Sequence, residues 1–185
     1  QACQQVASWR AESKLLQPSW VSVNLSAKQL AQPDLVDCID EILCQTNVPG
    51  SDLKLEITET GLMENIKTAS QLLLQLKERK IRLAIDDFGT GYSSLSYLHQ
   101  FPVQTLKIDR SFVKELESNG KAEIVQATIA LAHNLDLEIV AEGIETEYQK
   151  QVLKNYGCEL GQGYLFAKPL DADGATRYLQ HLVMS

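Results

Sequence analysis

Six short apolar runs of this chain stand next to side chains that can bind a metal ion or act on a phosphate. The residues concerned are Asn24, Glu56, Asp86, Asp87, Lys107, Asp109, Glu142 and Gln162. Carboxylate and amide oxygens are the ligands that Mg²⁺ and Mn²⁺ prefer, whereas thiolate-preferring ions choose other donors. A lysine beside such oxygens can orient a water nucleophile. The set therefore predicts metal-assisted phosphate chemistry.

The densest of these segments is Asp86-Asp87-Phe88-Gly89-Thr90-Gly91-Tyr92-Ser93-Ser94. Two adjacent carboxylates at a strand end can serve two cations, because one carboxylate can bridge both while its neighbour binds only the second. Gly89 and Gly91 then permit a tight loop. An acidic strand end followed by a turn is the alternative interpretation. Asn24 and Glu56, at the ends of neighbouring runs, argue against it.

Some of the other residues allow a structural interpretation as well. Asn24-Leu25-Ser26 could begin a helix, and Glu59 could be solvated or could support the 86–94 loop. Lys107 lies between two apolar residues of a strand, so we expect its side chain to face the lumen that the strands enclose. There it is either half of a structural ion pair or a group that orients a nucleophilic water.

Strand-like runs alternate with helix-like segments, which must position these side chains. We expect strands at 20–25, 53–58, 82–86, 105–109 and 138–142, and a short one near 163–166. We expect helices at 1–14, 33–46, 64–79, 93–99, 111–117, 121–134, 146–155 and 171–183. Leu72, Leu73 and Leu76, for example, recur at helical spacing. This alternation predicts parallel strands joined by right-handed crossovers.

The faces of the strands indicate a TIM-like (β/α)8 barrel. In the first run Ser22 and Asn24 point one way, while Val21, Val23 and Leu25 point the other. A barrel with a polar interior near its mouth and apolar contacts to outer helices has this pattern, and it delivers catalytic groups to one rim. A complete barrel takes about 250 residues. The 185 residues of this chain therefore represent roughly its last six strand–helix units.

The composition fits one domain over residues 1–185 and limits the class of partner. The net charge of −7 argues against a binder of nucleic-acid polymers, which need a basic surface. A small phosphate ligand is compatible with it, because bound divalent cations reverse the local sign of charge. No run approaches the ~18 apolar residues of a membrane span, and no signal peptide is visible. We therefore expect a cytoplasmic protein, or the cytoplasmic part of a membrane-anchored sensor.

The cysteines and histidines do not suggest a site. Four cysteines, Cys3, Cys38, Cys44 and Cys158, show neither a CxxC pair nor metal-ligand spacing. Reduced, mostly structural thiols are expected of such a set in a cytosolic protein. The three histidines lie in expected helices or at their ends, away from the carboxyl ends of the strands, so we expect surface or capping roles.

Six segments, in order along the chain, resemble the EAL domain family. They are residues 23–26, 55–60, 86–95, 106–113, 140–146 and 161–166. The resemblance covers essentially the whole chain. It implies hydrolysis of the bacterial second messenger cyclic di-GMP to linear pGpG by a two-metal mechanism. The alternatives are a receptor that binds cyclic di-GMP without cleaving it, or a regulatory dimerisation domain in a multidomain signalling protein.

The resemblance also implies a role for each polar strand end. Asn24, Glu56 and Asp86 would bind the first of two Mg²⁺ or Mn²⁺ ions, and Asp86 and Asp87 would bind the second. Glu56 and Asp86 would thereby be catalytic as well as metal-binding. Glu59 would anchor the 86–95 loop, which in this family couples the site to dimerisation.

The remaining residues would act on water and substrate. By the same resemblance, Lys107 would hold and help to activate the attacking water, and Glu142 would support the network of metal and water. Gln162, Glu145 and Asp109 would bind the substrate or lie around the second metal. The expected partners are cyclic di-GMP, a second copy of the chain, and fused sensor or GGDEF-type domains.

One feature departs from the family pattern. The Glu-Ala-Leu motif that names the family, whose glutamate is a metal ligand, is absent from the sequence. Every later signature is present, and the chain begins with Gln1 inside an expected helix. We therefore expect the motif to lie upstream of Gln1, and the chain to be the C-terminal three-quarters of the domain.

Overall fold

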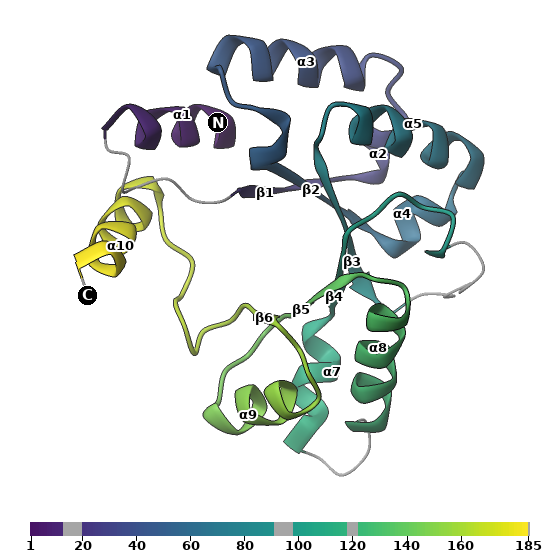
Figure 1. The fold of residues 1–185 in the computed structure, drawn as a ribbon, viewed down its shortest axis with the longest axis vertical. Coiled ribbons are helices and arrows are strands. Elements are labelled where there is room, and N and C mark those ends of the chain that lie inside the picture. Colours follow the sequence, from purple (N-terminus) through teal and green to yellow (C-terminus); the bar gives the residue numbers. More distant parts are fainter. Residues whose placement is uncertain (13–19, 91–97, 118–121, 185) are drawn as a thin grey trace.

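The computed structural model describes residues 1–12, 20–90, 98–117 and 122–184. Six parallel strands form a single sheet in which each strand pairs with the next along the chain, in the order β1-β2-β3-β4-β5-β6. The strands are β1 (Val21–Leu25), β2 (Leu53–Thr58), β3 (Arg82–Phe88), β4 (Thr105–Ile108), β5 (Glu138–Ala141) and β6 (Leu160–Gly161). Sequential parallel pairing is the strand order of a (β/α) barrel, and here it forms an open half-barrel (Figure 1).

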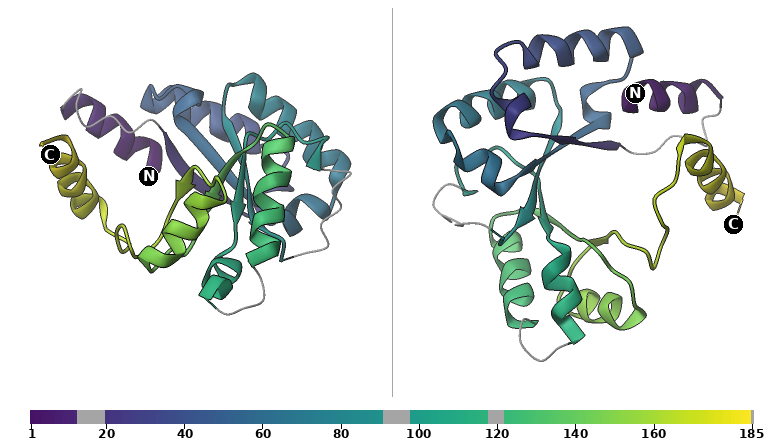
Figure 2. Two further views of the ribbon diagram at one scale, coloured as in Figure 1. Left: turned by 60° about the horizontal axis from the view of Figure 1, so that its bottom comes forward. Right: turned by 180° about the vertical axis from the view of Figure 1, so that it is seen from behind.

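Helices follow the strands and lie outside the curved sheet (Figures 1 and 2). They are α1 (Ala2–Glu12), α2 (Ala27–Leu30), α3 (Leu35–Thr46), α4 (Glu59–Met63), α5 (Ile66–Glu78), α7 (Arg110–Lys114), α8 (Ala122–Asn134), α9 (Glu147–Asn155) and α10 (Ala172–Met184). Short 3₁₀ turns occupy Gly50–Asp52 and Glu115–Glu117. Trp9 Nε1 donates to Thr176 Oγ1 at 2.8 Å, which joins the first helix to the last.

Local signals in the sequence explain where several helices begin. Asn65 caps α5 by accepting a hydrogen bond from the backbone of Thr68, and Thr146 forms a capping box with Gln149 at the start of α9.

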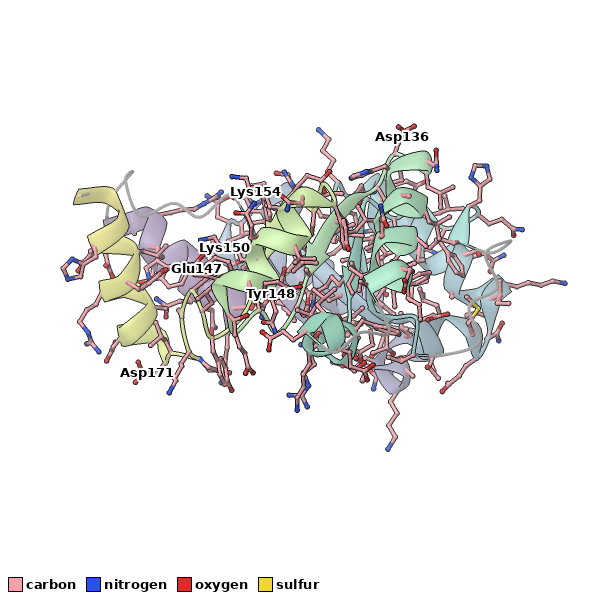
Figure 3. All side chains as sticks on the ribbon, turned by 90° about the horizontal axis from the view of Figure 1, so that it is seen from below. Asp136, Glu147, Tyr148, Lys150, Lys154 and Asp171 are labelled. Atoms are coloured by element: carbon pink, nitrogen blue, oxygen red, sulfur yellow. The ribbon has the colours of Figure 1, made fainter. Side chains whose placement is uncertain are left out.

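Helix α9 presents polar and charged side chains at the outer surface, among them Lys150 and Lys154 (Figure 3). Among the described residues, no helix combines the length and hydropathy needed to span a bilayer.

Alternation along the strands separates the core from the interior of the half-barrel. Leu55 and Ile57 of β2 point toward the outer helices, whereas Lys54 and Glu56 point to the concave face, where they line a cavity. The apolar core lies between sheet and helices. Its fully buried members include Leu73, Leu76, Leu83, Leu106, Ile129 and Ile139.

The prediction of a strand near 163–166 is wrong. The sixth strand is Leu160–Gly161, and the following residues form a turn in which Phe166 N donates to Gly163 O at 3.1 Å. Gly163 lies so close to the backbone of Ile144 that a Cβ atom there would approach its carbonyl oxygen to 2.1 Å. The apolar run suggested a strand, but Tyr164 and Phe166 are 59% and 45% exposed.

Two short helices were not expected, and one expected helix lies outside the structure. Helix α5 agrees with the helix expected at 64–79, whereas α4 precedes that range and was not predicted. The short helix α2 was not expected. Most of the helix expected at 93–99 lies outside the described residues. The helix expected at 111–117 is α7 followed by the 3₁₀ turn at Glu115–Glu117. The other expected helices and strands agree with the structure to within about two residues at each end, which is the usual scatter between assignments.

Two adjacent leucines of α5 test whether the apolar core between sheet and helices stabilises the fold. Leu73 is fully buried, whereas Leu74 is 53% exposed. Leu73→Ala should lower the free energy of unfolding by about 2–5 kcal/mol, because it removes apolar contacts and leaves a cavity. Leu74→Ala, the matched control, should change it by less than about 0.5 kcal/mol. Denaturant unfolding of both variants measures the difference, and equal effects would place the core elsewhere.

Candidate active site

Four charged side chains meet at the concave face of the sheet. Lys107 Nζ lies 2.5 Å from Glu56 Oε2, 3.0 Å from Asp86 Oδ1 and 2.6 Å from Glu142 Oε1. The four side chains are between 5% and 19% exposed. They come from β4, β2, β3 and the residue that follows β5, so the parallel sheet brings together groups that are far apart in sequence.

An irregularity in β3 separates the two adjacent aspartates. The pairing of β3 with β4 shifts between Ile85 and Phe88, and Asp87 has a positive φ of 53°. A bulge of this kind re-aims side chains at a strand end. Asp86 therefore points to Lys107, while the carboxyl group of Asp87 lies close enough to Asp109 for the two acids to interact. Asp87 N in turn donates to Asp86 Oδ1 at 3.0 Å.

Glu56, Asp86 and Glu142 fit a divalent cation of the hard, oxygen-preferring type. Each offers a carboxylate oxygen, and these three atoms lie within 4.8 Å of one another. All-oxygen donor sets suit Mg²⁺, Mn²⁺ or Ca²⁺. The geometry of this cluster therefore supports a metal site at the concave face.

Burial and mutual pairing shift the pKa values of the cluster. Burial alone would lower the pKa of Lys107, but its hydrogen bonds to Glu142 and Glu56 outweigh burial and raise that pKa above its usual range. Burial raises the pKa of Glu142, although Lys107 opposes the shift. Lys107 is therefore a firmly charged ammonium that offsets the repulsion among three carboxylates.

The pKa values of the neighbouring acids Asp87 and Asp109 shift in opposite directions. Burial and the nearby charges of Asp86 and Asp109 raise the pKa of Asp87. Burial would also raise the pKa of Asp109, but hydrogen bonds from the side chain and backbone of Ser111 outweigh it and lower that pKa. Asp109 caps the first turn of α7 through these bonds. The pair thus places a readily ionised carboxylate, Asp109, beside Asp87, which is harder to ionise.

Glu59 connects the start of α4 to the segment after β3. Its side chain is buried, and its Oε2 atom accepts a hydrogen bond from Gly89 N at 3.1 Å. Its Oε1 atom has no hydrogen-bond partner within the part of the chain that the structure describes. Gly89 has a φ of 94°, which a residue with a side chain rarely adopts. Glu59 therefore holds the first, described turn of the loop at a position that depends on glycine.

The other predicted residues lie at varying distances from the cluster. Asn24 is exposed at the end of β1, directly opposite Glu56 in the pairing of β1 with β2. Gln162 lines a cavity of about 230 Å³ together with Glu56 and Lys107. Glu145 is exposed and, among the described residues, its side chain has no ion-pair or hydrogen-bond partner. The structure thus brings Gln162 to the cavity but leaves Glu145 outside the cluster.

Sequence reasoning missed a second polar layer below the cluster. Lys54 Nζ lies 3.0 Å from Glu138 Oε2, which also accepts a hydrogen bond from Thr105 Oγ1 at 3.1 Å. Both Lys54 and Arg82 lie over the ring of Trp20, at 4.4 and 4.5 Å from its centre. These residues stand at strand beginnings, where no chemistry was expected. The available signal was period-2 alternation, which puts Lys54 on the same face as Glu56.

The model of the EAL domain family matches residues 1–169. The chain belongs to the EAL domain family. Among curated relatives, signaling protein YkoW of Bacillus subtilis is 39% identical over 180 residues, which cover 97% of this chain and 22% of YkoW. Cyclic di-GMP phosphodiesterase NbdA of Pseudomonas aeruginosa is 45% identical over 161 residues, which cover 86% of this chain and 21% of NbdA. The chain thus spans about a fifth of the length of these relatives.

Solved EAL domains share the fold. The MucR phosphodiesterase of Pseudomonas aeruginosa in complex with c-di-GMP superimposes with a TM-score of 0.88 at 42% identity, over 93% of this chain and 69% of that one. The EAL domain of Mycobacterium smegmatis DcpA gives 0.90 at 40% identity, over 97% of this chain and 81% of that one. Together with the sequential parallel strands, these matches confirm the barrel-type fold predicted for this EAL domain.

Replacing Lys107 should reveal the repulsion that it offsets. Lys107→Ala leaves three buried carboxylates without their shared ammonium, so we expect a loss of about 3–5 kcal/mol in unfolding free energy in the presence of EDTA. The raised pKa of Glu142 sets the sign of the pH dependence, because a buried acid destabilises the fold only where it is ionised. The loss should therefore be larger at about pH 8 than at about pH 5.

Thermal unfolding at the two pH values measures this effect. The control is Lys114→Ala, which removes an exposed lysine at the end of α7 and should change stability little at either pH. A Lys107 variant as stable as this control would show that the carboxylates do not depend on the ammonium.

Proposed function

We propose that this EAL domain hydrolyses cyclic di-GMP to linear pGpG. The observation that carries the proposal is the cluster of Glu56, Asp86, Lys107 and Glu142, which a parallel sheet gathers at one rim, where barrel enzymes place their catalytic groups. The similarity to NbdA, a cyclic di-GMP phosphodiesterase, and to the MucR phosphodiesterase in complex with c-di-GMP supports the same reaction and ligand.

We further propose that two Mg²⁺ or Mn²⁺ ions bind at this rim. Asn24, Glu56 and Asp86 would hold the first, and Asp86 and Asp87 the second. When bound, such ions stabilise charge on phosphoryl oxygens and lower the pKa of water. The raised pKa of Asp87 supports its place in the site, because a carboxylate that is costly to ionise alone is expected where a cation would complete its surroundings.

The residues of the chain would position the reacting groups. Lys107 Nζ is fixed by ion pairs with three carboxylates, and where a bound cation took over one of these carboxylates, the freed N–H group would hold a water oxygen next to the scissile phosphate. Glu142 orients that ammonium, and its raised pKa makes it a better proton acceptor than an exposed glutamate. Gln162, on the wall of the same cavity, would hydrogen-bond to the substrate. Asp109 and Glu145, which come after β4 and β5, would also bind it.

The segment after β3 would link the site to assembly. Glu59 fixes Gly89, three residues after Asp86, so a shift of this segment changes the position of a proposed metal ligand. We propose that a second copy of the chain packs near the 86–95 loop and acts through this contact. A homodimer would then have two sites whose activity depends on the loop.

Asp86→Asn tests the reaction. The change keeps the size of the side chain but removes the charge that would bridge both ions, so turnover should fall at least about 100-fold, equivalent to about 2.7 kcal/mol of barrier. Cyclic di-GMP is incubated with the full-length protein and Mn²⁺, and pGpG is measured by chromatography. Asp136→Asn, at an exposed position on the outer surface (Figure 3), is the matched control and should keep full activity.

The outcomes separate the proposed functions. If Asp86→Asn retained more than about a tenth of wild-type turnover, this result would contradict the two-metal assignment. Binding of cyclic di-GMP by the wild-type protein without any pGpG would instead identify a receptor. Neither binding nor turnover would leave the regulatory dimerisation role.

Glu59 offers a prediction about the loop that involves no proposed metal ligand. Glu59→Ala removes the acceptor of the Gly89 N–H group and should lower turnover about tenfold, because the segment that carries Asp86 loses its support. Glu59→Gln keeps a carbonyl oxygen in place and should restore most of the activity. Initial rates of the two variants decide the matter, and equal losses in both would assign the effect to the charge of Glu59.

A further inference from the structure

The second polar layer contains a lysine that the proposed reaction does not use. Lys54 is 3% exposed, and its ammonium contacts Glu138 at 3.0 Å and the face of Trp20 at 4.4 Å. Thr105 fixes the same oxygen of Glu138 at 3.1 Å. The ammonium therefore has a defined position inside the half-barrel.

This ammonium faces the same cavity as the carboxylate cluster. Lys54 and Glu56 are two residues apart on one face of β2, a spacing of about 6.6 Å along a strand. The cavity of about 230 Å³ is lined by Lys54 and Thr105 in the lower layer and by Glu56 and Lys107 in the upper one. Because Lys54 and Glu56 are both buried, solvent screens the interaction between the charges of the two layers only in part.

Stability alone does not account for the pair. Replacing a buried ion pair by apolar side chains is often neutral or stabilising, because both charges lose hydration. Val140 and Leu160 line the same cavity, so apolar side chains can fill this part of the interior. Glu138 keeps 36% of its side chain exposed and could be fully solvated without Lys54. A buried lysine is retained here at a cost that packing does not require.

We propose that Lys54 and Glu138 form a charge pair that sets how tightly the carboxylate cluster binds divalent cations. Lys54 lowers that affinity by placing a second ammonium below the cluster, which already contains Lys107. Glu138 limits the effect by tethering and neutralising Lys54. The inference rests on the proposed metal site, but it requires neither cyclic di-GMP nor catalysis.

The two halves of the pair should act in opposite directions. Lys54→Met removes the cation and leaves Glu138, so the affinity for Mn²⁺ alone should rise about tenfold. Glu138→Gln leaves the ammonium unpaired and should weaken Mn²⁺ binding about threefold or more. The double variant removes both charges and should return to within about threefold of the wild type. Free Mn²⁺ is measured by electron paramagnetic resonance during a titration without nucleotide.

Matched variants separate this effect from a change in overall charge or folding. Lys77→Met and Glu123→Gln make the same charge changes at exposed positions of α5 and α8, and both should leave the affinity within about twofold. Lys54→Arg keeps the charge and should resemble the wild type. Thermal unfolding in EDTA identifies any variant that does not fold. If Lys54→Met does not fold, Glu138→Gln and Lys54→Arg still test the inference.

Each result supports or overturns the inference. Shifts of opposite sign in the two single variants support it. Weaker binding in both would indicate structural damage, and unchanged binding in both would show that the pair does not act on the cluster; either overturns this inference alone. A wild-type protein that does not bind Mn²⁺ would contradict the proposed metal site and this inference together.

Discussion

The structure depends on one ammonium group that makes three buried carboxylates compatible. Glu56, Asp86 and Glu142 lie close enough to share a cation, and at this distance their mutual repulsion would tend to separate the strands. Lys107 contacts all three and remains charged. Because the carboxylates come from different strands, Lys107 also constrains the curvature of the sheet.

The parallel sheet and one bulge convert this electrostatic constraint into a site. Parallel strands end at one rim, so each contributes its last lumen-facing side chain to a shared place. A regular strand would point Asp86 and Asp87 to opposite faces. The bulge in β3 and the left-handed φ of Asp87 keep both near the rim, with Asp87 directed to Asp109 instead of Lys107. Two proposed metal positions thus arise from two adjacent residues.

Much of this arrangement could be predicted from the sequence, and the physical reason for each success or failure is local. Alternation within β2 and β4 is strong enough to direct Glu56 and Lys107 to one face. The turn at 163–166 was mistaken for a strand because two exposed aromatic residues there have the composition of one. The contact of Lys54 with Glu138 needs the register of β2 through β5, and the bulge depends on backbone angles. Neither is encoded in a short motif.

The two faces of the sheet therefore have different roles, one in stability and the other in binding. Apolar side chains toward the helices, such as Leu83 and Ile139, supply the stability. The lumen-facing side chains bury charge, which costs stability because the charges lose hydration, and it costs most where a charge has no partner. The lower pair of Lys54 with Glu138 is electrically neutral, whereas three carboxylates and Lys107 leave a charge of −2 in the upper cluster. That excess of negative charge is concentrated where a divalent cation can balance it, so the layer with the less balanced charge is also the one better prepared to bind a metal.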